Sequence, residues 1–188
     1  DVQPGETVVI YGVGGIGTAA VQGAVLAGAE RVVVVEPVEW KREKILEFGA
    51  THTAASHEDA FFLVQQFTNG AMADKAILCV GTAGGEHVAQ LMQMIKKAGR
   101  AVVTSVAPML GEDVKMNLFE FAMQRKELVG CIFGNANPQV DIPRLLSLYK
   151  AGKLKLDEMI TTEYTLDEIN KGYQDMRDGK NFRGLIKY

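Results

Sequence analysis

The sequence predicts an α/β protein with a doubly wound, six-stranded parallel sheet. Three observations support this: apolar, β-branched runs alternate with helical patterns, the connections between them are short, and six such runs precede residue 134. Alternating strands and helices favour right-handed βαβ units, and six strands complete a doubly wound sheet. The chain has 188 residues, 47% of them hydrophobic, and is long enough to bury a core of its own.

Each predicted strand is a short run of apolar residues. The first two are continuous and mostly β-branched, as is typical of strands covered on both faces, and the third is weak. An Asn-Gly pair precedes the fourth strand, and a glycine precedes the fifth. The strands are predicted at 7–11, 31–36, 51–54, 76–80, 100–105 and 128–133.

Four helices connect the first five of these strands in the prediction. The first contains small and aliphatic residues, the second is charged with apolar positions at helical spacing, and the other two carry aromatic, Leu, Met or Ile stripes. Glycines or an Asn-Gly pair follow them as end signals. The helices are predicted at 17–27, 39–48, 58–67 and 86–97, with Phe61, Phe62, Met92 and Met94 in the core.

The pattern changes after a turn at 135–138, Asn-Ala-Asn-Pro. This tail is too short to bury a sizeable core alone, so we expect it to pack on another part of the protein. The sequence therefore divides into a first domain, residues 1–134, and a C-terminal segment, residues 135–188. Within the segment, helices are predicted at 140–151 and 166–177, and strands at 160–164 and 183–186.

The composition argues against several classes of partner. A net charge of −3 without a long basic run argues against nucleic acid or an anionic membrane, and no apolar run approaches the about 20 residues of a membrane span. Cys79 and Cys131 lie in separate apolar runs without a C-x-x-C pair, so we expect buried, reduced thiols and no metal site. The chain begins at Asp1 without an initiator Met or a signal-peptide pattern, so we expect a fragment, whose targeting its N-terminus does not indicate. The whole protein is expected to be cytoplasmic.

One motif carries a specific chemistry, a Gly-x-Gly-x-x-Gly sequence with an added glycine directly after the first strand. The first glycine makes the tight turn, the second lets the backbone approach a pyrophosphate, and the third lets the next helix pack on the sheet. That helix presents free N–H groups and its positive dipole end to phosphates. In this βαβ context the motif predicts a dinucleotide site. Its residues are Gly12, Val13, Gly14, Gly15, Ile16 and Gly17.

An acidic residue at the end of the second strand selects the coenzyme. Glu36 stands 19 residues after Gly17, where a carboxylate accepts hydrogen bonds from the adenosine ribose and repels a 2′-phosphate. Pro37 and Val38 follow instead of an arginine, so we predict NAD rather than NADP. Lys41 stands about one helical turn after Glu36. We expect its side chain either to reach the ribose or to lie solvated on the face of the helix. A methyl-donor site of the S-adenosylmethionine type is disfavoured, because its motif usually lacks the third glycine.

Beyond this motif, the sequence resembles zinc-dependent, medium-chain alcohol dehydrogenases over essentially its whole length. The resemblance implies that the chain builds a coenzyme domain and that residues 135–188 return to a catalytic domain whose first part is missing here. The ligands of the catalytic zinc, the structural-zinc lobe and the Ser/Thr of the proton relay would lie in that missing part. His52, His57 and His87 do not match those positions, and we expect them at the surface or at helix ends. The resemblance rests on segments 7–17, 35–36, 47–50, 79–81, 130–134, 164–173 and 181–185, together with Lys41.

The resemblance also implies roles for individual residues. Val80, in the strand end 79–81, would flank the adenosine, and Arg183 would reach back to the pyrophosphate. Backbone groups of three residues would hold the nicotinamide carboxamide: the C=O of Thr104, the C=O of Cys131 and the N–H of Phe133. Two apolar side chains, Val106 and Ile132, would pack near the nicotinamide and the substrate. A homodimer is expected through the apolar edge strand 128–132, because an exposed edge needs cover.

We therefore expect the NAD-binding portion of an oxidoreductase that transfers a hydride between an alcohol or aldehyde and NAD, with zinc present only in the full-length enzyme. The chain alone is expected to bind NAD without turning over alcohol. Two tail stretches, 150–158 and 175–181, resemble an actinobacterial branch, some members of which keep their nicotinamide cofactor bound. The alternatives are the thiol-adduct formaldehyde dehydrogenase branch, a zinc-free quinone or enoyl reductase, and a non-catalytic NAD-sensing module.

Overall fold

The computed structural model describes residues 1–111 and 113–188. Its main sheet has six parallel strands in the order β3-β2-β1-β4-β5-β6, which confirms the predicted doubly wound sheet. The chain adds β2 and β3 on one side of β1, and then β5 and β6 on the far side of β4. The order in which strands are added therefore reverses between β1 and β4, which makes this the switch point of the sheet. The strands are β1 (Thr7–Tyr11), β2 (Arg31–Val35), β3 (His52–Ala54), β4 (Ala73–Leu78), β5 (Ile95–Val103) and β6 (Glu127–Gly130).

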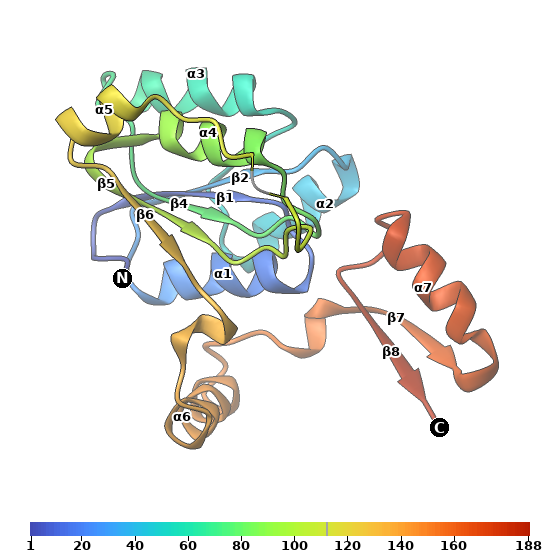
Figure 1. The fold of residues 1–188 in the computed structure, drawn as a ribbon. Coiled ribbons are helices and arrows are strands. Elements are labelled where there is room, and N and C mark those ends of the chain that lie inside the picture. Colours follow the sequence, from blue (N-terminus) through green and yellow to red (C-terminus); the bar gives the residue numbers. More distant parts are fainter. Residues whose placement is uncertain (112) are drawn as a thin grey trace.

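Helices cover both faces of the sheet (Figure 1). They are α1 (Gly15–Leu26), α2 (Glu39–Lys44) with the 3-10 turn η1 (Ile45–Phe48), α3 (His57–Phe67), α4 (Gly85–Met94) and α5 (Leu118–Met123). Successive strand residues point to opposite faces. Val8 and Ile10 therefore pack with α1 and η1, whereas Val9 and Tyr11 pack with α3 and α4.

Several predicted boundaries are wrong. The helix predicted at 86–97 ends at Met94, because Ile95 is extended and pairs with Ala73 as the start of β5. The helix predicted at 39–48 tightens into η1 after Lys44. Strand β6 ends at Gly130 rather than at residue 133, because Phe133 already belongs to the turn η2 (Phe133–Asn135).

Two predicted core positions also differ. Phe62, predicted to be buried with its helix stripe, lies on the exposed side of α3, whereas Met92 and Met94 are buried. Cys79 is buried, but Cys131, which follows β6, is only half-buried. Both thiols are free, as expected.

The C-terminal segment forms a smaller unit beside the sheet (Figure 1). It consists of α6 (Pro138–Lys150), η3 (Asp157–Met159), β7 (Ile160–Thr165), η4 (Leu166–Glu168), α7 (Ile169–Arg177) and β8 (Arg183–Lys187). β7 and β8 pair in parallel as a two-stranded sheet, and no residue of α6 is buried. A two-stranded sheet is marginal alone, so the contacts that attach this unit matter.

Several contacts join the segment to the main domain, and two of them are hydrogen bonds from α1 and α2. The side-chain amide of Gln22 in α1 bonds both backbone groups of Lys155. The indole of Trp40 in α2 donates to the Gly179 carbonyl at 3.2 Å.

The division at residues 134/135 stays a prediction. Among the described residues, no helix has the length and apolarity needed to cross a membrane.

Candidate functional site

A cleft of about 910 Å³ opens at the carboxyl ends of the central strands. One wall is formed by the turn after β1 and by the residues that follow β2, β4 and β5, and the opposite wall by β7, α7 and β8. The switch point between β1 and β4 lies at its base, which is where ligands bind in open α/β sheets. The cleft therefore brings together residues that are up to 175 positions apart in the sequence, from Tyr11 to Ile186.

The glycine-rich turn forms the floor of the cleft. A Cβ at Gly17 would collide with the Gly12 carbonyl, so only glycine lets α1 approach β1 this closely. At Gly14, in contrast, nothing lies within 4 Å of the position of a Cβ. Gly14 is also the N-cap of α1 and offers no side-chain acceptor to the first N–H groups of the helix. The turn thus leaves open space and unpaired donors for an anionic ligand.

Glu36 connects the end of β2 to this turn. Its carboxylate accepts a hydrogen bond from the Val13 N–H and another from the Val38 N–H, both at 3.0 Å. The residue is only 6% exposed, but it lines the cleft. Two carboxylate oxygens provide about four acceptor sites, so the group keeps capacity for further donors.

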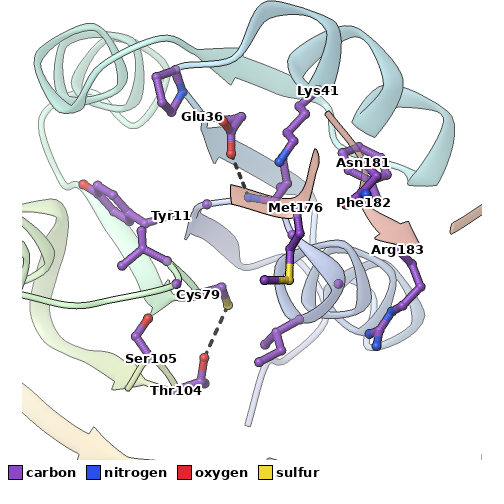
Figure 2. A pocket seen from close by; sticks show the side chains of 18 of the residues that line it. Tyr11, Glu36, Lys41, Cys79, Thr104, Ser105, Met176, Asn181, Phe182 and Arg183 are labelled. Carbon is purple, nitrogen blue, oxygen red and sulfur yellow. Dashed lines mark hydrogen bonds between the residues drawn. The ribbon is translucent and has the colours of Figure 1, made fainter. Parts of the chain in front are cut away.

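Lys41 lies in the cleft beside Glu36 (Figure 2). Of the two sequence interpretations, the solvated lysine is wrong, because the side chain is buried. Burial lowers the pKa of the Lys41 ammonium, and the nearby charge of Glu36 opposes this shift. The cleft therefore holds a cation and an anion close to the glycine turn.

Residues that follow β4 and β5 also line the cleft. Val80, Thr104 and Val106 all belong to this lining, as the resemblance implied. The Thr104 hydroxyl donates to the Leu78 carbonyl at 2.7 Å. Among the hydrogen bonds of the described residues, none uses the Thr104 carbonyl. That carbonyl is an acceptor without a partner at the cleft.

Cys131 and Phe133 are not brought into the cleft lining. The early end of β6 places Phe133 in η2, where its side chain is 91% exposed. Among the described residues, the Cys131 carbonyl and the Phe133 N–H take part in no hydrogen bond. They remain available as an acceptor and a donor.

Arg183, the first residue of β8, lies against the start of α1. Its guanidinium is so close to Gly15 that a Cβ there would collide with it. A planar guanidinium with five donors is suited to phosphate oxygens. The structure thus places a cation from the C-terminal segment at the glycine-rich turn, which the sequence analysis expected only from the resemblance. Ile16 of the same turn also lines the cleft.

The sequence analysis missed a polar chain at one wall. The Tyr11 hydroxyl lies 2.8 Å from His57 Nδ1, and His57 Nε2 lies 3.2 Å from the Gln93 Oε1. Burial raises the pKa of the Tyr11 phenol, with a smaller contribution from Glu58. His57 begins α3, as expected of a helix-end histidine, but it also lines the cleft. No local sequence signal indicates this, because the partners are 46 and 36 residues away.

In the described part of the chain, no three His, Cys, Asp or Glu side chains are grouped so that they could hold a metal ion. The cleft offers hydrogen-bonding and charged groups. An anion fits the glycine turn with Arg183, and hydroxyl donors fit Glu36. This combination is suited to a dinucleotide.

Comparisons with known proteins agree with this geometry. The family model described as "Zinc-binding dehydrogenase" matches residues 15–151. Alcohol dehydrogenase B of Mycobacterium tuberculosis is 49% identical over 188 residues, which is 100% of this chain and 50% of that protein. The NDMA-dependent alcohol dehydrogenase of Amycolatopsis methanolica is 49% identical over 187 residues, with the same coverage. The chain thus spans about half the length of the curated relatives it matches.

Solved structures give the same result. Benzyl alcohol dehydrogenase from Acinetobacter calcoaceticus superposes with a TM-score of 0.91 at 28% identity and covers 100% of this chain and 51% of its own. A zinc-binding dehydrogenase from Sinorhizobium meliloti, solved bound to NADP, has a TM-score of 0.76 at 30% identity and covers 90% of this chain and 48% of its own. These matches confirm the resemblance inferred from the sequence motifs.

Proposed function

The chain belongs to the zinc-binding dehydrogenase family, and on this premise we propose that it is the coenzyme-binding part of an alcohol dehydrogenase that prefers NAD. The observation that carries the proposal is the Glu36 carboxylate, held at the glycine-rich turn by the Val13 N–H. Relatives named as alcohol dehydrogenases, at 49% identity, support the alcohol substrate.

The proposed binding mode follows the cleft from end to end. The pyrophosphate would lie over Gly14 and the first N–H groups of α1, with the Arg183 guanidinium as counter-charge. Glu36 would accept hydrogen bonds from the adenosine ribose hydroxyls, with Lys41 beside it. Val80 would pack against the adenosine.

The nicotinamide end would extend from the cleft at Thr104 to two backbone groups outside its lining, those of Cys131 and Phe133. A carboxamide has two N–H donors and one carbonyl acceptor, which match the C=O of Thr104, the C=O of Cys131 and the N–H of Phe133. These contacts would fix which face of the ring meets the substrate, beside Val106. When bound, NAD supplies the hydride acceptor; the chain's residues bind and orient it.

The described residues do not fit a zinc site, so we assign no step to zinc in this chain. The relatives are about twice as long as the matched region. We propose that the zinc ligands and most of the alcohol pocket belong to the part of such proteins that has no counterpart here. On this view, residues 135–188 pack on that catalytic part, which accounts for the exposed helix α6.

We also keep the proposal of a homodimer through β6. Its pairing within the described residues is with β5 alone, so its other edge presents free backbone groups. Edges of this kind require cover. Size-exclusion chromatography with light scattering would test this assembly.

The test of the coenzyme proposal is a fluorescence titration with NADH and with NADPH. We expect NADH to bind more tightly, and Glu36→Ala to weaken NADH about tenfold or more, because hydrogen bonds to a charged group are worth about 1.5–3 kcal/mol each. Glu43→Ala, an exposed carboxylate in the same region, is the matched control. Equal or tighter NADPH binding by the unmodified protein would overturn the role of Glu36 and favour the zinc-free reductase reading.

A further inference from the structure

Helix α7 forms a cleft wall whose side chains have no assigned role. Tyr173 and Met176 both line the cleft from this helix, together with Ile169. Met176 is 57% exposed, although it is a large apolar side chain. Figure 2 shows it reaching into the centre of the cleft, with Glu36 and Lys41 above it and Arg183 to one side. An apolar side chain in this position faces the space that the dinucleotide would fill.

The wall is fixed to the coenzyme domain by an aromatic cluster. The ring of Phe182 lies 5.1 Å from that of Trp40 and 5.9 Å from that of Phe48, measured between centroids. Phe182 is buried, and the Trp40 indole donates to the carbonyl of Gly179. The loop between α7 and β8 is therefore held against α2 and η1.

Buried hydrogen bonds connect α7 itself to this loop. The Tyr164 hydroxyl donates to Asp175 Oδ2 at 3.0 Å and accepts from the Asn181 amide at 3.1 Å. Asp175 precedes Met176 by one residue, and Asn181 precedes Phe182 by one. The position of Met176 across from the glycine-rich turn is thus set by several independent contacts rather than by a loose helix.

We infer that Met176 is a coenzyme-contact residue that packs its thioether against the dinucleotide over the glycine-rich turn. The inference rests on the proposed function and adds a second, apolar wall to a site otherwise described by its polar floor. The wall covers the side of the ligand that faces away from the sheet and excludes water there. Thioethers are flexible and polarizable, which suits contact with both ribose and ring surfaces. Met176 binds and positions the coenzyme; it moves no proton.

The test compares Met176→Ala with Met176→Leu and with the control Met123→Ala in the protein that contains this chain. Met123 is similarly exposed, at 68%, on α5 away from the cleft lining. Each buried methylene-sized group is worth about fourfold in affinity, so loss of three partly covered groups predicts NADH binding about tenfold weaker. Stopped-flow displacement should show faster NADH release. Leucine should keep the affinity within about twofold.

The outcomes distinguish a failure of the Met176 contact from a failure of the coenzyme site itself. Weaker NADH binding with an unchanged melting temperature in Met176→Ala supports a contact role. Loss of a merely structural residue would lower the melting temperature. If Met176→Ala binds and releases NADH as Met123→Ala does, the inference is overturned while the coenzyme site stands. If the unmodified protein binds neither NADH nor NADPH, the proposed function fails, and the inference with it.

Discussion

The side-chain amide of Gln22 pairs with both backbone groups of Lys155 and so joins helix α1 to the C-terminal segment. Nε2 donates to the Lys155 carbonyl at 2.9 Å, and Oε1 accepts from the Lys155 N–H at 2.7 Å. Gln22 is only 4% exposed. We therefore expect Gln22→Ala to loosen the attachment of the segment and to destabilise the protein.

The magnitude follows from the groups left without partners. A buried donor or acceptor that loses its partner costs about 1–3 kcal/mol, so two part-buried backbone groups predict a loss of roughly 3 kcal/mol in the free energy of unfolding. For chains of about 150–250 residues, each kcal/mol shifts the melting temperature by about 2–4 °C, which gives a decrease of roughly 6–12 °C.

Calorimetry measures this decrease directly, and limited proteolysis locates it. Gln66→Ala is the matched control, because Gln66 is exposed on α3 and its side chain has no hydrogen bond among the described residues. Cleavage between α6 and β7 should become faster in Gln22→Ala only. A melting temperature equal to that of Gln66→Ala would refute the view that this amide is a main attachment point.

Three further predictions concern the cleft. Gly14→Ala has room for its methyl group, so we expect an unchanged melting temperature but NADH affinity lower by roughly tenfold in a titration, because the pyrophosphate needs that space. Burial raises the pKa of the Cys79 thiol to about 11, and the hydrogen bond from Thr104 opposes this shift. At pH 8 roughly one thousandth of Cys79 is thiolate, the reactive form. Mass spectrometry after alkylation should therefore find Cys131 modified before Cys79. Since this pKa lies above the ordinary 9.0, the contribution of Cys79 to stability is complete below pH 9 and is lost as the pH rises toward 11, which pH-dependent melting would follow. Finally, NADPH affinity should rise about tenfold in Glu36→Ala, and this gain should disappear in Glu36→Ala/Lys41→Ala, because the buried ammonium would then be absent from the 2′-phosphate site.

Local patterns predicted the sheet well, because each βαβ unit is encoded by neighbouring residues. The continuous apolar runs of β1 and β2 and the glycine turn between β1 and α1 were predictable for this reason. The boundary at Met94 was not, since the apolar stripe of α4 runs directly into β5. There the pairing of Ile95 with Ala73 decides the conformation, and such pairing is not visible in a single segment.

Cleft residues were predictable where one motif supplies them, whereas contributions from distant segments were missed unless the family resemblance pointed to them, as it did for Arg183. Glu36 follows from its spacing, but the burial of Lys41 depends on the C-terminal loop near Gly179. Gln22 looks like an ordinary polar residue of a helix until Lys155 is beside it. The whole α7 wall, including Met176, belongs to this second group, because a helical stripe alone does not indicate which surface it faces.

The Sinorhizobium meliloti relative was solved bound to NADP, so the NAD preference proposed for this chain needs a basis in its own residues. We propose Glu36 as that basis. Glu36 cannot turn away from the ribose at little cost, since its oxygens already hold the N–H groups of Val13 and Val38. A 2′-phosphate would therefore meet a negative charge that is held in place, and like charges repel. Lys41 offsets part of this repulsion, but its charge already interacts with Glu36. On the proposed binding mode, the hydrogen bonds that shape the glycine-rich turn also hold Glu36 in place, and a change of coenzyme preference would require replacing Glu36.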